Sequence, residues 1–374
     1  MSKIAIVGAG NAGCISALTL NFLKETEAAD EIDEIVIYHD PNTPIERVGQ
    51  GTILTIRNNL FECLDLNWYD KNSIKATIKA GIRYLGWGKD NHDFMHAFTS
   101  GGIACHYVPK LLSNATLESG KFTVVEEEIT DPDNQIDSDY IIDCRGKPKL
   151  DKTYERLTNP LNTVLLSRKE PADPRLLWTD CIATPNGWTF VIPNHDSVSY
   201  GYLYNDSITT REDAESDFRD TFAVEIDGEL KFDNYVAKNI WASDRRILNG
   251  NRYSFIEPLE ATASGIHNEV AESFFDFLIE EKTKEEVNKY MYNRVKQNQD
   301  FILMHYANGS KYDTPFWDFA KSLDYTDKKS LQAQLDRCRG LPKIIDYGEI
   351  DEKFLYGQWE PPSFTFWEDK VGGP

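Results

Sequence analysis

The sequence has no closely paired cysteines and no apolar run long enough to cross a membrane. Its six cysteines are scattered along 374 residues without a CxxC pair, and its seven histidines also lack the spacing of metal ligands. A membrane helix needs about 20 apolar residues in succession, and none of that length is present. We therefore expect a reduced, cytoplasmic protein with no metal and no membrane span.

Basic residues are also scarce relative to acidic ones. The chain has 40 Lys and Arg against 61 Asp and Glu, a net charge of −21. Such a surface repels nucleic acid and anionic membranes, so we expect neither as a partner. The first residues enter a strand at once, without a basic region followed by an apolar stretch, and we expect no signal peptide. The composition leaves homo-oligomerisation open.

The first forty residues predict a dinucleotide-binding unit. The stretch "KIAIVGAGNAG" is an apolar strand followed by Gly8, Gly10 and Gly13 in GxGxxG spacing, and an apolar helix comes next. The glycines allow a tight turn, a close pyrophosphate and close helix packing. A second strand, "EIVIYHD", ends at His39 and Asp40, where a ribose-binding carboxylate is expected. The alternative is a glycine-rich turn that binds no nucleotide, and the motif does not separate FAD from NAD.

The rest of the chain predicts an α/β fold in which distant strands and helices build one body. Residues 175–204 alternate as strands of a mostly antiparallel sheet, residues 263–320 have a helical pattern, and "TREDAESDFRDTF" is a helix with a Thr cap. Five further segments carry weaker patterns. We expect strands in "KFTVVEEEIT" and "SDYIIDCRGK", a loop leading into a helix in "VGQGTILTIRNNLFECL", mixed helix and strand in "SIKATIKAGIRYLGW", and irregular structure in the tail "GQWEPPSFTFWEDKVGGP".

Several stretches, taken in order, resemble the flavin-dependent halogenases, the tryptophan halogenase family. The family has GxGxxG near the N-terminus and G-W-x-W-x-I-P near the middle, where this chain has "GWTFVIP" with Phe190 in place of the second Trp. "YIIDCRG" resembles the family's D-C-S/T-G strand, and "LNGNRYSFIEPLEATASGIH" resembles its G-N-A…P-L-E segment. "SVSYGYLY" and "DFILMHY…DTPFW" also match family segments. The resemblance covers roughly residues 3 to 320.

The resemblance implies a Rossmann-type FAD-binding fold of the flavin monooxygenase (PHBH-like) kind, with an antiparallel sheet. Residues 1–262 would form the FAD-binding body with inserted substrate-facing segments, and residues 263–374 a helical C-terminal substrate region that packs on the same body. The implied reaction uses reduced FAD (FADH2), O2 and a halide ion to make hypohalous acid, which halogenates a small electron-rich aromatic such as an indole or phenol. A separate NAD(P)H-dependent flavin reductase would supply FADH2, since no nicotinamide site is visible. The chain is shorter than the family's free-tryptophan enzymes, so the resemblance does not specify tryptophan.

The resemblance assigns the catalytic roles to Lys79 and Glu260. Lys79 would position or capture the halogen, either as a neutral amine or as an ammonium that hydrogen-bonds hypohalous acid, and the sequence leaves both open. Glu260 would stabilise the arene cation or remove its proton. Without the resemblance, Lys79 reads as a surface lysine, like Lys75 and Lys89, and Glu260 as an acid in the first turn of a helix.

Further residues carry implied contacts. His96 and Phe98 match a family H-x-F pair that stacks on the substrate ring, with core packing as the alternative. Trp188 and Phe190 would keep the substrate away from the flavin; taken alone, their segment reads as a hairpin strand after Asn-Gly. The remaining implied contacts are Thr262, Ser264 and Gly265 for halide, and Gly49, Gly250 and Asn251 for flavin; His106 has a weaker claim.

Two departures from the family pattern bear on these contacts. Gln50 stands where the family has Glu, and one or two extra residues lie around Ala263. Three other functions compete with halogenation: a flavin monooxygenase that hydroxylates an aromatic, an NAD-dependent dehydrogenase, and a flavin-binding protein without activity. The retention of Lys79 and Glu260 favours halogenation.

Overall fold

The computed structural model describes most of the chain. The described residues are 1–27, 30–45, 50–52, 62–66, 72–88, 92–98, 104–170, 176–340 and 355–372. Gly49, Lys89 and most of the predicted helix after Thr52 lie outside them. No helix within these ranges is both long and apolar enough to cross a membrane. These ranges also contain no group of three His, Cys, Asp or Glu side chains placed to hold a metal ion.

One half of the molecule is built on a five-stranded parallel sheet, which contains both strands predicted for the dinucleotide-binding unit. The strand order is β17-β9-β1-β2-β8. Apolar residues line both faces, which is typical of a parallel sheet covered on both sides. The strands are β1 (Ser2–Val7), β2 (Ile32–His39), β8 (Thr123–Glu126), β9 (Tyr140–Asp143) and β17 (Arg246–Leu248).

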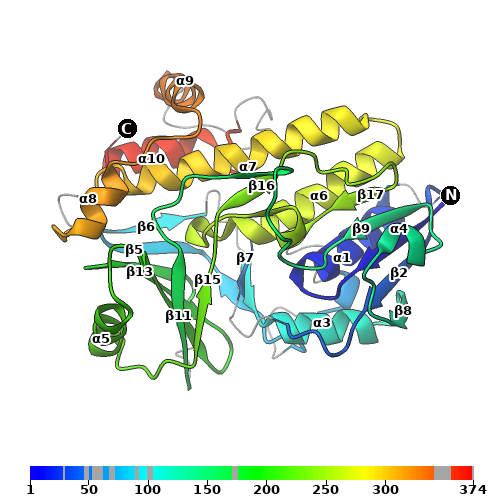
Figure 1. Cartoon of the computed structure of the whole chain (residues 1–374), viewed down its shortest axis with the longest axis horizontal. Helices are drawn as coiled ribbons and strands as arrows, with labels where there is room; N and C mark the ends of the chain where they lie inside the picture. The colour runs from blue at the N-terminus through cyan, green and yellow to red at the C-terminus, as the bar shows by residue number, and fades with distance from the viewer. Residues whose placement is uncertain are drawn as a thin grey trace.

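Helix α1 (Asn11–Thr26) follows β1 directly and packs against α6 (Thr262–Leu278). The contact includes a buried hydrogen bond in which Thr19 Oγ1 donates to Asn268 Oδ1 over 2.8 Å. This packing brings the chain near residue 260 back to the nucleotide-binding half. Helices α3 (Pro109–Glu118) and α4 (Pro132–Gln135) complete this side of the molecule, on the right of Figure 1.

A second, seven-stranded sheet forms the other half. Its order is β15-β11-β14-β13-β12-β5-β6, and every neighbouring pair is antiparallel except β12 and β5. The predicted mostly antiparallel sheet is therefore confirmed. Its strands are β5 (Gly81–Trp87), β6 (His92–Ala97), β11 (Thr163–Lys169), β12 (Thr179–Thr184), β13 (Gly187–Pro193), β14 (Val198–Tyr204) and β15 (Gly228–Lys231).

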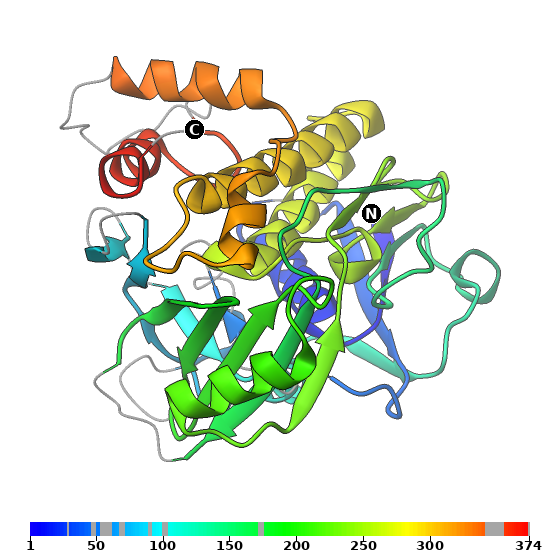
Figure 2. The ribbon, with the colours of Figure 1, turned by 60° about the vertical axis from the view of Figure 1, so that its left-hand side comes forward.

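The predicted helix after Thr210 is α5 (Arg211–Phe222), which lies on one face of this sheet in Figure 2. Thr210 caps it, since its side chain accepts from the Asp213 amide, as its sequence predicted. The prediction of mixed helix and strand for "SIKATIKAGIRYLGW" is wrong in its helical part. Residues 73–87 contain no helix, and residues 77–79 and 81–87 form strands.

Two small three-stranded sheets join the halves, in the orders β3-β7-β4 and β10-β16-β18. The first brings Gly51 and Lys79 to opposite sides of β7. The strands are β3 (Gln50–Gly51), β4 (Thr77–Lys79), β7 (Ala104–Tyr107), β10 (Tyr154–Arg156), β16 (Tyr235–Ala237) and β18 (Ser254–Phe255), and two short 3-10 helices follow at η2 (Gly250–Arg252) and η3 (Leu259–Ala261).

The C-terminal part is helical, and two long helices lie side by side in the upper half of Figure 1. These are α6 and α7 (Lys284–Tyr306); α8 (Pro315–Lys321), α9 (Lys328–Arg339) and α10 (Pro361–Lys370) follow. The prediction of an irregular tail was wrong. Helix α10 forms because Pro361 and Pro362 open its first turn, where a missing N–H costs no hydrogen bond, and because Phe364 and Trp367 are buried against the body.

Candidate active site

Lys79, the last residue of β4, is buried in the interior. Its side chain is 1% exposed, and Nζ lies 3.5 Å from the Thr52 carbonyl oxygen and 5.5 Å from the centre of the Phe98 ring. Burial lowers the pKa of Lys79 from 10.5 to about 8, and the nearby Glu260 carboxylate opposes this shift. The interpretation of Lys79 as a surface lysine is therefore wrong. Because its pKa is about 8, both the ammonium and the amine form are populated near neutral pH.

Glu260 is also buried and is held by side chains from four elements. Its Oε1 accepts from the Tyr84 hydroxyl over 2.5 Å and lies 3.1 Å from His96 Nδ1 and 3.0 Å from His305 Nε2. Its Oε2 accepts from the Trp359 indole N–H over 3.2 Å. Burial alone would raise the pKa of Glu260, but the two histidines lower it well below the usual value. The site therefore keeps this carboxylate charged.

The His305 ring contacts both Glu260 and a backbone carbonyl. Its Nδ1 lies 2.8 Å from the Phe301 carbonyl oxygen, which can only accept, so Nδ1 carries a hydrogen. Burial lowers the pKa of His305 and by itself favours a neutral ring. A neutral ring would, however, turn a bare Nε2 towards Oε1 of the carboxylate. The protonated ring, by contrast, would donate from Nε2 to Oε1, so the charged carboxylate opposes the effect of burial on the His305 pKa.

The backbone between Glu260 and helix α6 has an unusual conformation. Glu260 and Ala261 have φ values of +68° and +56°, a left-handed pair without glycine. Each such residue costs roughly 1–2 kcal/mol. A Cβ added to Gly51 would lie 3.1 Å from Lys79 Nζ and 3.6 Å from Ala261 Cβ, so the turn approaches the lysine closely. This places the buried lysine beside the start of α6.

The residues expected to bind halide open helix α6. Thr262, Ser264 and Gly265 are buried in its first turn, and the N-cap, Ala261, makes no side-chain cap hydrogen bond. Ser264 Oγ donates to the Gly51 carbonyl over 3.0 Å. The Ser264 hydroxyl thus binds Gly51, the residue that also lies close to Lys79 and Ala261.

The H-x-F pair lies between the two predicted catalytic residues. His96 contacts Glu260 and Phe98 contacts Lys79, because residues two apart on β6 and its extension share one face. The His96 ring also stacks on Phe366 of α10, with centres 5.4 Å apart. The structure therefore brings together four residues predicted from sequence.

The strand "GWTFVIP" is β13, a hairpin strand as predicted. The Phe190 ring lies over Gly201 of β14, where an added Cβ would be 2.1 Å from the Phe190 Cζ atom. Trp188 is fully buried, with its ring centre 6.3 Å from those of both Trp87 and Phe190. These aromatics form a packed layer at the centre of the antiparallel sheet.

The predicted flavin-binding glycines form a tight cradle. An added Cβ would lie 2.9 Å from the Cys144 carbonyl oxygen at Gly8, 1.8 Å from the Gly8 oxygen at Gly13, and 2.5 Å from Ala12 Cβ at Gly250. Gly10 is the N-cap of α1 and provides no side-chain cap. Among the described residues, no side-chain cap therefore occupies the first amides of α1, which suits binding of a phosphate.

The other residues predicted to contact the cofactor, and His106, make hydrogen bonds within the protein. His39 ends β2, and the Asp40 carboxylate after it accepts from the Asn42 amide over 2.9 Å and from Thr43 Oγ1 over 3.0 Å. Asn251 lies in η2, where its carbonyl accepts from the Tyr235 hydroxyl over 2.6 Å. His106 is buried, with Nε2 2.8 Å from Thr179 Oγ1, and burial and Lys79 lower its pKa well below the usual value.

Sequence reasoning missed Tyr84, His305 and Trp359, which contact Glu260 directly. Trp367 was missed as well; its ring centre lies 3.6 Å from that of His305. The segment "DFILMHY" contained the one available signal, because His305 follows a helical apolar pattern and is itself buried. Trp359 gave none, since it lies 99 residues from Glu260 along the chain.

Comparison with known proteins places these features in one family. The family model described as tryptophan halogenase matches residues 3–113 and 113–360. Tryptophan 7-halogenase RebH of Lentzea aerocolonigenes is 24% identical over 77% of this chain and 58% of its own length. Tryptophan 6-halogenase ThaL of Streptomyces albogriseolus is 25% identical over 62% of this chain and 46% of its own. The chain thus spans about half the length of these two relatives.

Solved structures share the fold. The tryptophan 6-halogenase SttH of Streptomyces toxytricini has a TM-score of 0.76 at 20% identity, covering 100% of this chain and 91% of that one. The flavin-dependent halogenase BrvH of Brevundimonas sp. BAL3 has a TM-score of 0.77 at 18% identity, covering 99% and 89%. These likenesses confirm the Rossmann-type α/β architecture predicted from the sequence. Since the family model matches most of the residues, the chain belongs to the tryptophan halogenase family.

Proposed function

We propose that the protein is an FADH2-dependent halogenase acting on a small electron-rich aromatic compound, such as an indole or a phenol. The observation that carries this proposal is the buried pair Lys79 and Glu260, with His96 and Phe98 between them. A desolvated lysine beside a fixed carboxylate suits delivery of an electrophilic halogen followed by loss of a proton. A flavin hydroxylase would not need this lysine.

The residues present fit a flavin dinucleotide. The first turn of α1 and the cradle at Gly8, Gly10, Gly13 and Gly250 would hold its diphosphate, with Asn251 nearby, and His39 and Asp40 would lie towards its ribose. When bound, FADH2 with O2 supplies the oxidising equivalents that turn a halide into hypohalous acid. A separate flavin reductase would provide FADH2 in the cytoplasm. Residues 1–262 would form this body, with 263–374 as the substrate-facing helical region.

Each carboxylate oxygen of Glu260 would have its own task. Oε1 receives three contacts and is held rigidly, whereas among the described residues Oε2 receives the Trp359 N–H at a longer 3.2 Å. Oε2 is therefore the oxygen that would accept the substrate proton. Lys79 would act either as the amine that captures halogen or as the ammonium that hydrogen-bonds hypohalous acid.

The remaining contacts follow from the same geometry. His96 and Phe98 would orient the substrate ring, and the amides around Thr262, Ser264 and Gly265 would bind halide near the positive Lys79. The packed layer of Trp188 and Phe190 would separate substrate from flavin, and its full burial suits a rigid wall.

Mass spectrometry on a panel of indoles and phenols tests the proposal. The protein is incubated with FAD, a flavin reductase, NADH, O2 and chloride, bromide or iodide in turn. A halogen mass shift is expected with the parent protein and with Lys75→Met, whose lysine pairs with Asp196 at the surface. The shift should vanish in Lys79→Met, while flavin oxidation continues.

Two results would contradict the proposal. A mass gain of one oxygen without halogen would indicate an aromatic hydroxylase. Halogenation by Lys79→Met at the parent rate would remove Lys79 from the mechanism.

A further inference from the structure

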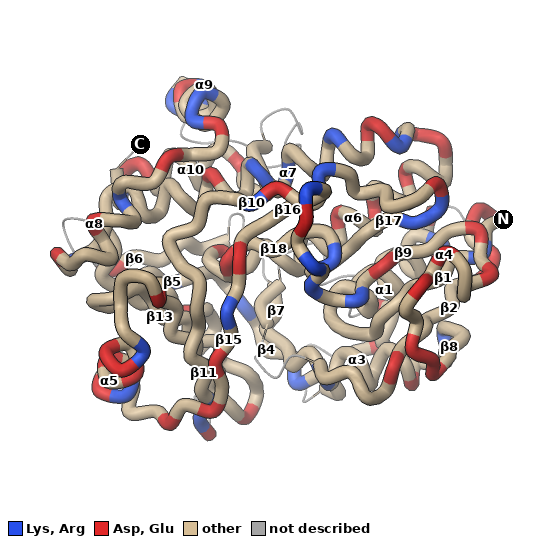
Figure 3. The backbone as a smooth tube through the Cα atoms, viewed as in Figure 1, with Lys and Arg blue, Asp and Glu red and all other residues tan. Residues whose placement is uncertain are grey.

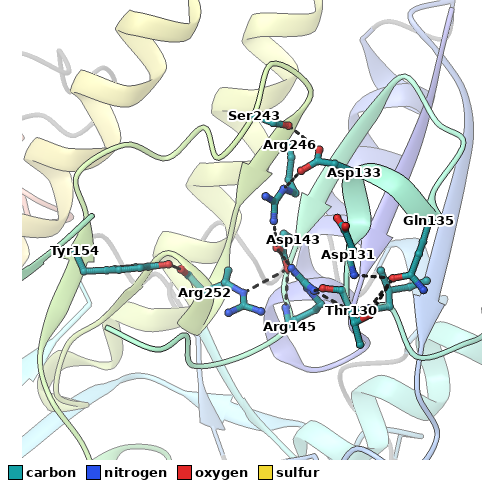
Figure 4. Close-up of polar contacts among 11 residues, drawn as sticks. Thr130, Asp131, Asp133, Gln135, Asp143, Arg145, Tyr154, Ser243, Arg246 and Arg252 are labelled. Atoms are coloured by element: carbon teal, nitrogen blue, oxygen red, sulfur yellow. Dashed lines mark hydrogen bonds and ion pairs between the residues drawn. The ribbon is translucent and has the colours of Figure 1, made fainter. Parts of the chain in front are cut away.

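A buried carboxylate at the end of β9 is surrounded by three arginines. Asp143 is fully buried, and the Arg145 guanidinium binds both its oxygens, over 2.8 and 2.7 Å. Arg246 Nη1 donates over 3.1 Å, and Arg252 Nε lies 3.6 Å away. Figure 4 shows the three guanidinium groups approaching Asp143 from different sides.

The three arginines differ in the number and closeness of their carboxylate and carbonyl partners. Arg145 also donates to the carbonyls of Ile129 and Thr130, over 3.1 and 2.7 Å, and Arg246 pairs with Asp133 over 2.9 Å. Arg252 has the longest contact of the three with Asp143, and its side chain is 21% exposed. Two carboxylates therefore face three guanidinium groups, which leaves one positive charge over, at Arg252.

This charge lies at the predicted diphosphate cradle. The Cys144 carbonyl, next to Asp143, touches the position where Gly8 would carry a side chain. Gly250, two residues before Arg252, packs against Ala12 in the first turn of α1. Cys144, next to the carboxylate that Arg252 contacts, and Gly250, two residues before Arg252, thus both touch the glycine turn or the first turn of α1. We expect these turns to face the phosphates.

A positive side chain at this place would offset the negative charge of the rest of the chain towards a phosphate ligand. The chain has a net charge of −21, so its overall field repels a ligand with two phosphate charges. Figure 3 shows several Lys and Arg positions near the labels β10 and β16, in a chain with many acidic segments elsewhere. The family pattern quoted above has Ser or Thr where Arg145 stands and Ala where Arg252 stands, so both cations are additions in this chain.

We propose that Arg252, oriented by Asp143, binds the diphosphate of the flavin dinucleotide and makes affinity depend on its adenylate half. Arg145 and Arg246 neutralise and fix Asp143, which leaves the planar Arg252 fork able to turn towards phosphate oxygens. The inference rests on the proposed function, in that FAD must bind at the cradle.

Equilibrium binding of three oxidised probes, FAD, ADP and riboflavin, tests the proposal without any turnover. Arg252→Ala restores the residue of the family pattern, and circular dichroism checks its fold. We expect FAD and ADP to bind about tenfold more weakly, which corresponds to ~1.4 kcal/mol, with riboflavin binding unchanged. Arg252→Lys should recover part of the loss, and raised salt should weaken FAD binding less in Arg252→Ala than in the parent.

The matched control is Arg156→Ala. Arg156 lies on β10, is exposed and pairs with Asp233. This variant should leave all three affinities unchanged. The inference is overturned if Arg252→Ala, or Arg252→Gln should the alanine variant not fold, binds FAD and ADP as the parent does. A parent protein that binds no FAD would instead overturn the proposed function.

Discussion

Replacing Lys79 with methionine should make the protein more stable while abolishing its activity. Burial lowers the pKa of Lys79 from 10.5 to about 8, and at 1.36 kcal/mol per pH unit this corresponds to about 3 kcal/mol of destabilisation at pH 7. Methionine has a similar volume and needs no hydration. Since the contact of Nζ with the Thr52 carbonyl is also lost, we expect a net gain of about 1–3 kcal/mol in the free energy of unfolding.

The pH dependence of this gain identifies its cause. Below pH 8 Lys79 is protonated in both the folded and the unfolded state, so the folded state carries the full cost of a buried ammonium. Between pH 8 and 10.5 the folded state releases the proton while the unfolded state keeps it, and the cost shrinks. The advantage of Lys79→Met over the parent should therefore be largest below about pH 8 and should fall by about 3 kcal/mol between pH 8 and 10.5, to zero or below.

Urea denaturation of both proteins at a series of pH values, followed by tryptophan fluorescence, measures the difference. Groups that titrate equally in the two proteins cancel in the comparison. Lys75→Met serves as the control: its lysine pairs with Asp196 at the surface, and because that pair titrates through Asp196 in the acid range, the variant should show no gain that changes between pH 7 and 10.5. A Lys79→Met variant no more stable than the parent at pH 7, or an advantage that persists at every pH, would refute the reasoning.

Three further substitutions test neighbouring features. Gly201→Ala should lower the free energy of unfolding by about 1–3 kcal/mol in urea, because its Cβ would lie 2.1 Å from the Phe190 ring; a smaller loss in the background Phe190→Leu would confirm the clash. Ala261→Gly should raise stability by about 0.5–1 kcal/mol in the same assay, because φ is +56° there, and a loss would contradict the strain. His305→Gln should raise the pKa of Glu260 and move the acidic limb of the halogenation rate to higher pH; an unmoved limb would contradict the role of His305 in lowering this pKa.

Local patterns predicted much of the fold. The apolar strand, the glycine turn and the following helix predicted β1 and α1, since each depends only on neighbouring residues. The Thr210 cap predicted the start of α5 in the same way. Lys79 and Glu260 were found through the family resemblance, and the structure then added their burial. In the tail, by contrast, the paired prolines were read as a sign of irregular structure, although proline favours the first turn of a helix.

The surroundings of Glu260 could not be predicted from the sequence. Its contacts come from β5, β6, α7 and the segment before α10, at separations of 176, 164, 45 and 99 residues. No periodicity links residues so far apart. The left-handed turn at Glu260 and Ala261 was equally hidden, because neither residue type favours that conformation and only tertiary packing imposes it.

Several unfavourable features of the fold lie together at one place, and this argues for function. A buried ammonium and two adjacent left-handed residues each cost stability, and each could be removed by a common substitution. They lie within one site, next to the well-packed aromatic layer around Trp188. Packing alone would favour an apolar residue at Lys79 and glycine at Ala261. The retention of both is better explained by a reaction that needs a desolvated amine and a carboxylate in a fixed position.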